Sequence, residues 1–256
     1  MERPIEASIS VVTCVLLDDM KEREEHLRHL FRTTYGDVEE LIIHAAGKKE
    51  DVRAYRSLLK ELDTEGKVRY AFSYGLQPAP CFADKRLWQI ARHSYLIECP
   101  GDIYPQTERW AAKLVYVLHQ YPRLGMVFVR QHNTYWEEVA GDAERFPVCH
   151  NTYALSREAL EDIGYWDWKH SPYACDDDII LSLRQRGYFP ICVRNILVVH
   201  KHKPDERAER HGKKAFEEVP EKYGVPYNSP LQWRMFPQVQ FPFLEDKSLW
   251  GGEPSR

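Results

Sequence analysis

The sequence predicts an α/β fold, in which a mostly parallel central sheet is flanked by helices and followed by a C-terminal extension. Short apolar runs rich in β-branched residues alternate with longer stretches of helical periodicity through the first half of the chain. Of the 256 residues, 43% are hydrophobic, which is enough for one substantial core and tight for two independent domains. We therefore expect one main domain over residues 1–203 and an extension over 204–256 that packs on it.

Each predicted strand is a short apolar run of the kind that is buried on both faces of a sheet. The runs span residues 9–17, 40–44, 68–72, 94–99, 125–129, 148–156 and 188–199. The first run, ISVVTCVLL, is the clearest because it is long and rich in β-branched residues. Beyond residue 130 the alternation of strands and helices becomes less regular.

Between the strands, apolar residues recur every three or four positions, which is the period of an amphipathic helix. The clearest stripe is formed by Val52, Tyr55, Leu58, Leu59 and Leu62. Further helices are expected around residues 27–31, 82–93, 110–118, 157–164 and 176–186. Gly164 and Gly187 stand where the last two helices should end, and glycine is the usual residue just past a helix C-terminus.

Composition excludes several classes of function. Lys and Arg number 35 against 39 Asp and Glu, and no basic stripe of the kind that follows a nucleic-acid backbone is present. No run approaches the roughly 18 to 20 apolar residues that span a bilayer, and the N-terminal MERPIEAS does not have the apolar core of a signal peptide. We expect a soluble, cytoplasmic protein that has no nucleic-acid partner and whose six dispersed cysteines are reduced.

A candidate ligand site lies in the loop ECPGDIYP, residues 98–105. In an open parallel sheet, ligands bind outside the carboxyl ends of the strands, and this loop follows a predicted strand. Asp102 stands there after a glycine and could offer a carboxylate oxygen to a divalent cation that bridges phosphates. The local sequence favours equally a purely structural Asp102 that caps a helix or stabilises a turn.

The segment VVHKH, residues 198–202, ends another predicted strand with two imidazoles. Alternate residues of a strand point the same way, so His200 and His202 could face one cleft. A single histidine at a strand end is more often a hydrogen-bonded structural residue than a ligand. The combination with an independent loop carboxylate favours the ligand interpretation.

Three aspartates, Asp176, Asp177 and Asp178, precede the short apolar helix of DDDIILSLRQRGY. Acidic residues at a helix N-terminus interact well with the helix dipole, which accounts for one of them. Three in succession exceed that need, and a carboxylate at such a place is a candidate general base. The preceding aromatic residues Trp166 and Trp168 suit either the flat face of a sugar ring or core packing.

The order of these features resembles that of the GT-A-fold glycosyltransferases of family 2, nucleotide-sugar enzymes that are mostly inverting. The resemblance covers roughly residues 8–202 and is most specific in the second half, where residue types and spacing agree at separated points. The matching series is Gly164, Tyr165, Trp166, Asp167, Asp177, Asp178, Leu181, Arg184, Gly187, Tyr188 and His200.

The resemblance implies a role for each matched position. Asp178, with Asp177 beside it in the family's Glu-Asp position, would remove a proton from the acceptor hydroxyl. Asp102 falls on the last aspartate of the family's DxD motif and His200 on its late histidine, so both would hold Mn²⁺ or Mg²⁺. The remaining expected site residues are Trp166, Asp167 and Trp168 on the acceptor side and Thr13, Gly47, Lys48, Lys85 and Arg86 on the donor side.

The sequence departs from the family pattern at two places. Pro100 replaces the first aspartate of the DxD motif, which leaves one carboxylate in that loop. HAAGKK, residues 44–49, replaces an Asp-Asp-Gly-Ser pattern and retains only Gly47, so the nucleotide base of the donor is left open. Lys48, Lys85 and Arg86 could hold phosphates, but solvated surface charges are the commoner case.

The resemblance thus implies transfer of a sugar, with inversion, from a nucleoside-diphosphate sugar to a glycan or another hydroxyl acceptor. A non-catalytic nucleotide-sugar or glycan-binding protein of the same fold is the main alternative. A metal-dependent hydrolase that uses His150, His200, His202 and the aspartate cluster ranks below it, because its ligands would come from distant loops and the sequence has no HExxH-like signature. The transferase hypothesis requires Asp102, Asp178 and His200 to lie around one pocket.

Overall fold

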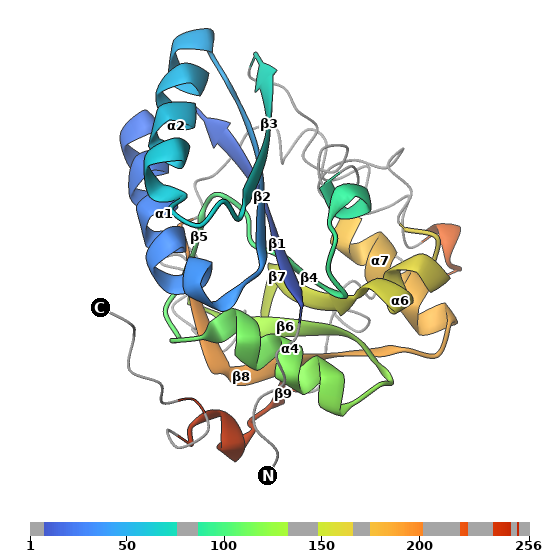
Figure 1. Cartoon of the computed structure of the whole chain (residues 1–256). Coiled ribbons are helices and arrows are strands. Elements are labelled where there is room, and N and C mark those ends of the chain that lie inside the picture. The colour runs from blue at the N-terminus through green and yellow to red at the C-terminus, as the bar shows by residue number, and fades with distance from the viewer. Residues whose placement is uncertain are drawn as a thin grey trace, which may run out of the picture.

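The computed structural model describes residues 8–75, 87–132, 148–165, 175–201, 221–224, 238–246 and 250. Within these ranges the chain forms a single sheet with helices on both of its faces (Figure 1). The described strands are β1 (Ile9–Leu17), β2 (Glu40–Gly47), β3 (Val68–Tyr74), β4 (Tyr95–Glu98), β5 (Ile103–Pro105), β6 (Leu124–His132), β7 (Val148–Ser156), β8 (Phe189–His200) and β9 (Gln238–Val239).

The order of the strands across the sheet is β3-β2-β1-β4-β7-β6-β8-β5, and β9 pairs with β8. The first four strands of this order are parallel, as the alternation of strands and helices predicts. The sheet is mixed rather than purely parallel: five of its eight described strand pairs are parallel, as expected of a mostly parallel sheet, and three are antiparallel. β7 runs antiparallel to both β4 and β6, and β5 runs antiparallel to β8.

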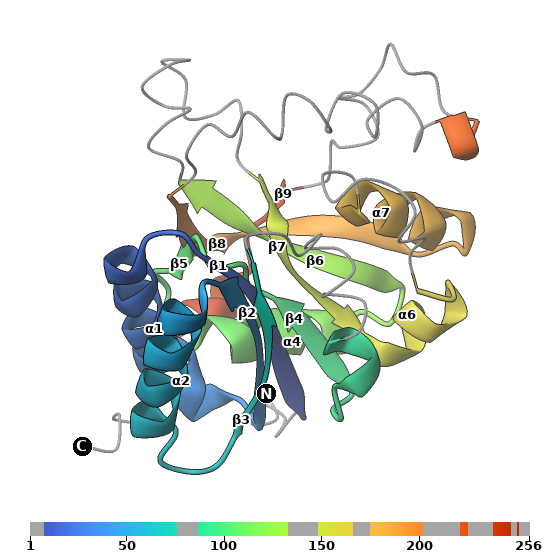
Figure 2. The ribbon, with the colours of Figure 1, turned by 90° about the horizontal axis from the view of Figure 1, so that it is seen from above.

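Helices cover the two faces of the sheet (Figure 2). α1 (Met20–Thr34), α2 (Lys49–Leu62) and α4 (Trp110–Gln120) pack on one face, and α6 (Arg157–Asp162) and α7 (Cys175–Gln185) pack on the other. Short 3₁₀ turns follow at η1 (Tyr35–Asp37) and η4 (Pro242–Leu244). No helix within the described ranges is both long enough and apolar enough to cross a membrane.

The core divides into one apolar cluster on each face of the sheet. Tyr55 and Trp110 are fully buried on the side of α1, α2 and α4, where the Trp110 indole donates a hydrogen bond to Thr34 Oγ1 at 3.0 Å. Trp88 and Ile179 are fully buried on the side of α6 and α7. Apolar residues on both faces of one sheet explain why the strands read as nearly continuous apolar runs.

The seven strands predicted from apolar runs are all present, with bounds that differ by a few residues. Of the helix expected over 82–93, residues 87–90 are helical, and 82–86 lie outside the described residues. β5 was not predicted, because its three residues, Ile103–Pro105, are too few to show a period and include a proline. Gly164 and Gly187 both have positive φ, of 74° and 81°, as expected just past α6 and α7.

The described parts of the C-terminal extension pack on the main sheet and its helices. β9 pairs with Cys192 and Val193 of β8. Trp250 is buried in the same cluster as α4, its ring stands edge-on to Tyr116 at 5.6 Å, and its indole donates to Phe243 O at 2.9 Å. These contacts cover α4 and the part of β8 around Cys192 and Val193.

Candidate functional site

The loop that carries Asp102 lies directly against β1. Gly101 N donates to Cys14 O at 3.0 Å, and a Cβ built on Gly101 would stand 3.1 Å from both Cys14 O and Val15 Cγ2. Such contacts are tighter than the backbone and side chain of β1 readily accept. Glycine therefore lets the chain turn closely over the carboxyl end of β1, and Asp102 follows at that edge of the sheet.

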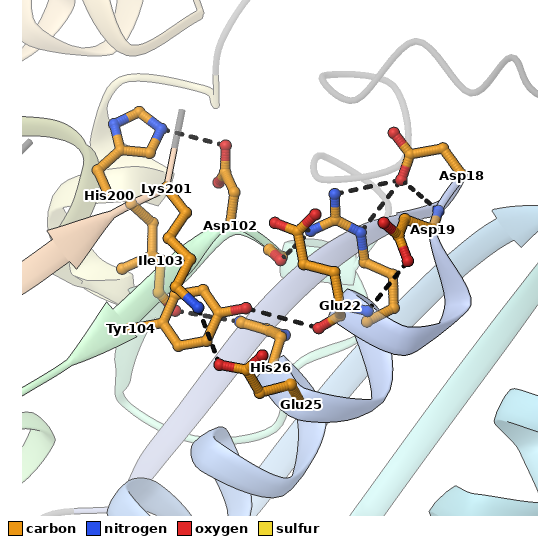
Figure 3. A network of polar contacts seen from close by, with 12 residues as sticks. Asp18, Asp19, Glu22, Glu25, His26, Asp102, Ile103, Tyr104, His200 and Lys201 are labelled. Atoms are coloured by element: carbon orange, nitrogen blue, oxygen red, sulfur yellow. Dashed lines mark hydrogen bonds and ion pairs between the residues drawn. The ribbon is translucent and has the colours of Figure 1, made fainter. Parts of the chain in front are cut away.

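Asp102 and His200 lie in contact although they are 98 positions apart in the sequence (Figure 3). The antiparallel pairing of β5 with β8 sets Ile103 opposite His200, and Lys201 N donates to Asp102 O at 2.9 Å. His200 Nε2 consequently stands 3.1 Å from Asp102 Oδ2. The His200 side chain is 8% exposed and that of Asp102 is 32% exposed, so the carboxylate is partly exposed to solvent while the imidazole is nearly buried.

The Asp102–His200 pair fits a divalent cation by the chemistry of its donors. One carboxylate oxygen and one imidazole nitrogen are ligand types that Mn²⁺ accepts, and Mg²⁺ is commonly held by one or two carboxylates together with phosphates and water. Among the described residues, no group of three or more His, Cys, Asp or Glu side chains is close enough to hold a metal ion. The pair by itself therefore offers a cation two ligands.

Asp178 occupies a different environment, in the first turn of α7. Its side chain is 1% exposed, and Oδ1 accepts from Lys222 Nζ at 2.7 Å and from the Tyr223 hydroxyl at 2.6 Å. Ser182, one turn further along α7, stands 2.6 Å from the same hydroxyl. Residues 221–224 of the extension thus contact the expected general base.

The electrostatics of Lys222 and Tyr223 agree with this geometry. Burial alone would lower the pKa of Lys222, but hydrogen bonds to Asp178 and Tyr223 raise it above its usual value. Burial and the hydrogen bond to Asp178 raise the pKa of Tyr223. At physiological pH, Lys222 is therefore a cation and Tyr223 a neutral hydroxyl, and both donate a hydrogen bond to Asp178.

The three aspartates at the start of α7 are not equivalent. Asp177 is 0% exposed and Asp178 is 1% exposed, whereas Asp176 is half-buried. All three stand in the first turn, where the helix dipole stabilises negative charge. The dipole alone does not require burial, so the two buried carboxylates are the ones that need a further explanation.

Asp178 does not share the contact that joins Asp102 to His200. A turn at Gly187 returns the chain from α7 to β8, so the helix runs antiparallel to that strand. α7 and β5 stand at opposite sides of Figures 1 and 2. The structure thus joins Asp102 to His200, while the expectation that Asp178 shares a pocket with them stays a prediction.

The expected donor-side residues that the structure describes belong to the middle of β1, the end of β2 and the N-cap of α2. Thr13 is fully buried in β1, where its hydroxyl donates to Cys99 O, so it supports the start of the Asp102 loop and does not face solvent. A Cβ on Gly47 would stand 2.6 Å from Leu17 Cβ, which makes close packing of β1 and β2 sufficient to explain that glycine. Lys48 is exposed at the N-cap of α2.

Several residues singled out in the sequence lie outside the described part of the chain. They are Lys85 and Arg86 on the donor side, Trp166, Asp167 and Trp168 on the acceptor side, and His202. The side chain of His150 is likewise not described. The roles expected for these residues stay predictions.

Several residues that surround the expected site were not identified from the sequence. Lys222 and Tyr223 are 44 and 45 positions from Asp178, and no local pattern links them to it. Arg23, His26 and His29 of α1 contact the backbone on either side of Asp102. Their three-residue spacing is visible in the sequence, and Leu27 and Leu30, which follow His26 and His29 directly, indicate that this side of the helix is buried.

Comparisons with known proteins bear on the fold. No family model matches the chain, and no curated protein matches its sequence. A mannosyltransferase from Pyrobaculum calidifontis, PcManGT, solved with GDP-Man and Mn²⁺, superposes with a TM-score of 0.66 at 15% identity over 89% of this chain and 68% of its own. Glucosyl-3-phosphoglycerate synthase from Mycobacterium tuberculosis, solved with Mn²⁺, UDP and glucosyl-3-phosphoglycerate, gives 0.59 at 13% identity over 86% and 81%.

A third solved structure is GalNAc-T7 with UDP, GalNAc and Mn²⁺, which gives a TM-score of 0.57 at 14% identity. That match covers 78% of this chain and 44% of GalNAc-T7. Identities this low establish similarity of architecture and leave the activity to be argued from the site. The mixed sheet and its flanking helices are those of the GT-A glycosyltransferase fold, and this chain has that fold.

Proposed function

We propose that the chain is a metal-dependent glycosyltransferase, similar to family 2, that moves a sugar from a nucleoside-diphosphate donor to an acceptor hydroxyl. The observation that carries this proposal is the contact between Asp102 and His200 at the edge of a GT-A sheet. A solvent-open carboxylate beside a nearly buried imidazole offers two metal ligands and leaves room for phosphate oxygens. The three solved neighbours, which carry Mn²⁺ with GDP-Man or UDP, support the same donor class.

Asp102 and His200 would hold Mn²⁺ or Mg²⁺, which when bound stabilises the negative charge that develops on the departing diphosphate. Asp102 presents its open carboxylate to the donor side, and His200 supports it from the sheet. Lys48, exposed beside the end of β2, is available to phosphates.

Asp178 is proposed as the general base, with Asp177 supporting it in the same helical turn. As the acceptor oxygen attacks the anomeric carbon, its proton passes to Asp178, and the bond between that carbon and the diphosphate oxygen breaks with its electron pair leaving on the diphosphate. A single displacement inverts the anomeric configuration. Inversion is tested by NMR of the first product formed from a donor of known configuration, and retention would contradict this route.

The proposal is tested by thermal unfolding with UDP, GDP, UDP-glucose and GDP-mannose, each with and without Mn²⁺. A ligand that binds the native state raises the melting temperature according to its concentration and affinity. We expect one diphosphate to stabilise the chain, more strongly with Mn²⁺, and its sugar form to be consumed. Absence of a shift with every nucleotide in both conditions would contradict the donor site.

A second function, nucleotide-sugar or glycan binding without turnover, is favoured by one specific observation. Lys222 and Tyr223 both occupy Oδ1 of Asp178, the atom that would otherwise be open to an acceptor proton. A binding protein of this kind would gain thermal stability with a nucleotide sugar but leave the sugar uncleaved over hours. Consumption of the donor that is lost in Asp178→Asn decides for the transferase.

A further inference from the structure

β5 (Ile103–Pro105), the strand that follows Asp102, ends the order of strands across the sheet and pairs with β8 on one side. Its other side lies against α1, where three side chains hydrogen-bond to alternate backbone carbonyls. Arg23 Nη1 donates to Gly101 O at 2.6 Å, and His26 Nε2 stands 3.1 Å from Ile103 O. His29 Nε2 stands 2.7 Å from Pro105 O.

This set of contacts, which we call the α1 ladder, takes the place of a neighbouring strand. Alternate carbonyls of a strand, here those of Ile103 and Pro105, point to the same edge, and Gly101 precedes the strand in a turn that Ile103 N closes by donating to Pro100 O at 3.0 Å. Residues three apart on a helix lie on one side of it. Three side chains spaced by three residues therefore satisfy three carbonyls spaced by two. The carbonyl between the first two, that of Asp102, points the other way and accepts from Lys201 N at 2.9 Å.

His26 is the central member of the ladder and has one defined state. It is fully buried, and burial lowers its pKa to about 4, so its imidazole is neutral at physiological pH. Ile103 O can only accept, so the proton must reside on Nε2, and Nδ1 has no hydrogen-bond partner among the described residues. The ring is therefore a fixed donor that meets the backbone one residue after Asp102.

Arg23 connects the ladder to the loop after β1. Its guanidinium, in a side chain that is 10% exposed, also bonds to Asp18 Oδ1 through Nε and Nη2, both at 3.2 Å. Asp18 follows β1 directly and Gly101 packs on that strand, so one buried cation ties together two loops at the same edge of the sheet. Figure 3 shows Asp18, His26 and Asp102 in one network with His200.

We propose that Arg23, His26 and His29 are positioning residues that hold residues 101–105 so that Asp102 and His200 stay placed to bind a divalent cation. This inference rests on the proposed function. A ladder that served only to cover the edge of β5 would contribute stability without affecting cation affinity. The two roles are distinguished by a measurement of binding in the folded protein.

The test compares His26→Leu, which removes the donor, with His26→Gln, whose amide N–H can reach the same carbonyl. Binding of Mn²⁺ is measured from the EPR signal of the free ion, in the presence of UDP or GDP, and unfolding by urea without metal is measured in parallel. We expect His26→Leu to weaken Mn²⁺ binding by roughly ten- to a hundredfold, the usual cost of losing a group that orients a metal ligand. His26→Gln should restore most of that loss.

Arg28→Leu is the matched control on the same helix. Arg28 pairs with Glu24 and Glu61 away from the ladder, so its loss should leave Mn²⁺ affinity unchanged. If His26→Leu does not fold, the half-buried His29→Leu decides, with a smaller loss of affinity expected. Destabilised variants that bind Mn²⁺ as tightly as wild type would overturn the inference and leave the proposed function standing. A wild-type chain that binds no Mn²⁺ with either nucleotide would contradict both.

Discussion

The two acidic ends of the candidate site are built in different ways. The backbone on both sides of Asp102 is held by three contacts. Gly101 packs on β1, β5 pairs with β8, and His26 of α1 hydrogen-bonds to Ile103 O. Asp178 is fixed through its own carboxylate, which is buried and accepts from Lys222 and Tyr223. The side chain of Asp102, whose carboxylate contacts His200, is 32% exposed, whereas that of Asp178 is 1% exposed.

This difference separates two ways of preparing a charged group for function. A metal ligand needs a fixed position and an exposed face, and backbone contacts on both sides of Asp102 can supply the fixed position. A general base must exchange its partner for the acceptor hydroxyl, so contacts to the carboxylate compete with the reaction. The hydrogen bonds of Lys222 and Tyr223 would therefore have to give way for Asp178 to accept a proton on Oδ1, whereas neither bond is made to Oδ2.

The largest effect is expected from Asp178→Asn, assayed with the donor that the wild-type chain consumes. Loss of a general base lowers kcat by roughly 10² to 10⁴-fold. The amide cannot accept the acceptor proton but keeps the size of the side chain. Asp176→Asn, in the same turn but half-buried, should retain full turnover. Equal activity of both variants would remove Asp178 from the chemistry and favour the binding protein.

Asp102→Asn tests the metal end. We expect Mn²⁺ affinity to fall by at least about a hundredfold, because even groups that only orient a ligand cost roughly ten- to a hundredfold. The amide has one neutral oxygen in place of the charge that attracts the cation. Glu25→Gln is the control, since Glu25 is exposed and pairs with Lys201 beside the site. An Asp102 variant that binds Mn²⁺ as wild type does would place the ion elsewhere.

Local sequence predicted the elements that bury apolar residues but not the direction in which strands pair. β1 could be read from ISVVTCVLL because burial on both faces selects apolar residues throughout. β7 is equally buried at residues 152–155, yet nothing in that run distinguishes an antiparallel neighbour from a parallel one. Pairing direction depends on the connections between strands, which carry no comparable pattern.

The candidate site could likewise be predicted only from residue types and their order along the chain. Asp102 and His200 were identified by residue type and by their order along the chain, and their contact follows from the pairing of β5 with β8. Lys222 had no such signal, because a lysine in a charged segment is usually a solvated surface residue. Contacts between distant segments depend on how the chain returns to the sheet, and the spacing of residues does not encode that path.

Acid should lower the stability of the fold through His26. Its pKa is lowered to about 4 by burial, whereas the unfolded chain has the usual value near 6.5. As the pH falls from 6.5 to 4, the His26 imidazole is protonated in the unfolded chain but stays neutral in the folded chain. The free energy of unfolding therefore decreases, by up to roughly 3 kcal/mol. Stability from this group is complete above pH 6.5.

Urea unfolding of wild type and His26→Gln at pH 7 and pH 4.5 measures this contribution. The variant has no imidazole at position 26 and should lose less stability on acidification. Other histidines whose pKa is lowered by burial, such as His44, remain in both proteins and cancel in the comparison. Identical losses in the two proteins would show that His26 is not held neutral in the fold.

The smallest effect is expected at the other end, in a double-mutant cycle of Asp178→Asn and Lys222→Met followed by urea unfolding. The Lys222 side chain is 36% exposed, so solvent screens part of the attraction, and we expect a coupling of about 1–2 kcal/mol. The exposed pair of Lys201 and Glu25 is the matched control and should couple by less than about 0.5 kcal/mol. A coupling at Asp178 no larger than the control would mean that Lys222 leaves the carboxylate readily. In that case the contrast between an open metal ligand and an engaged base would not hold in solution.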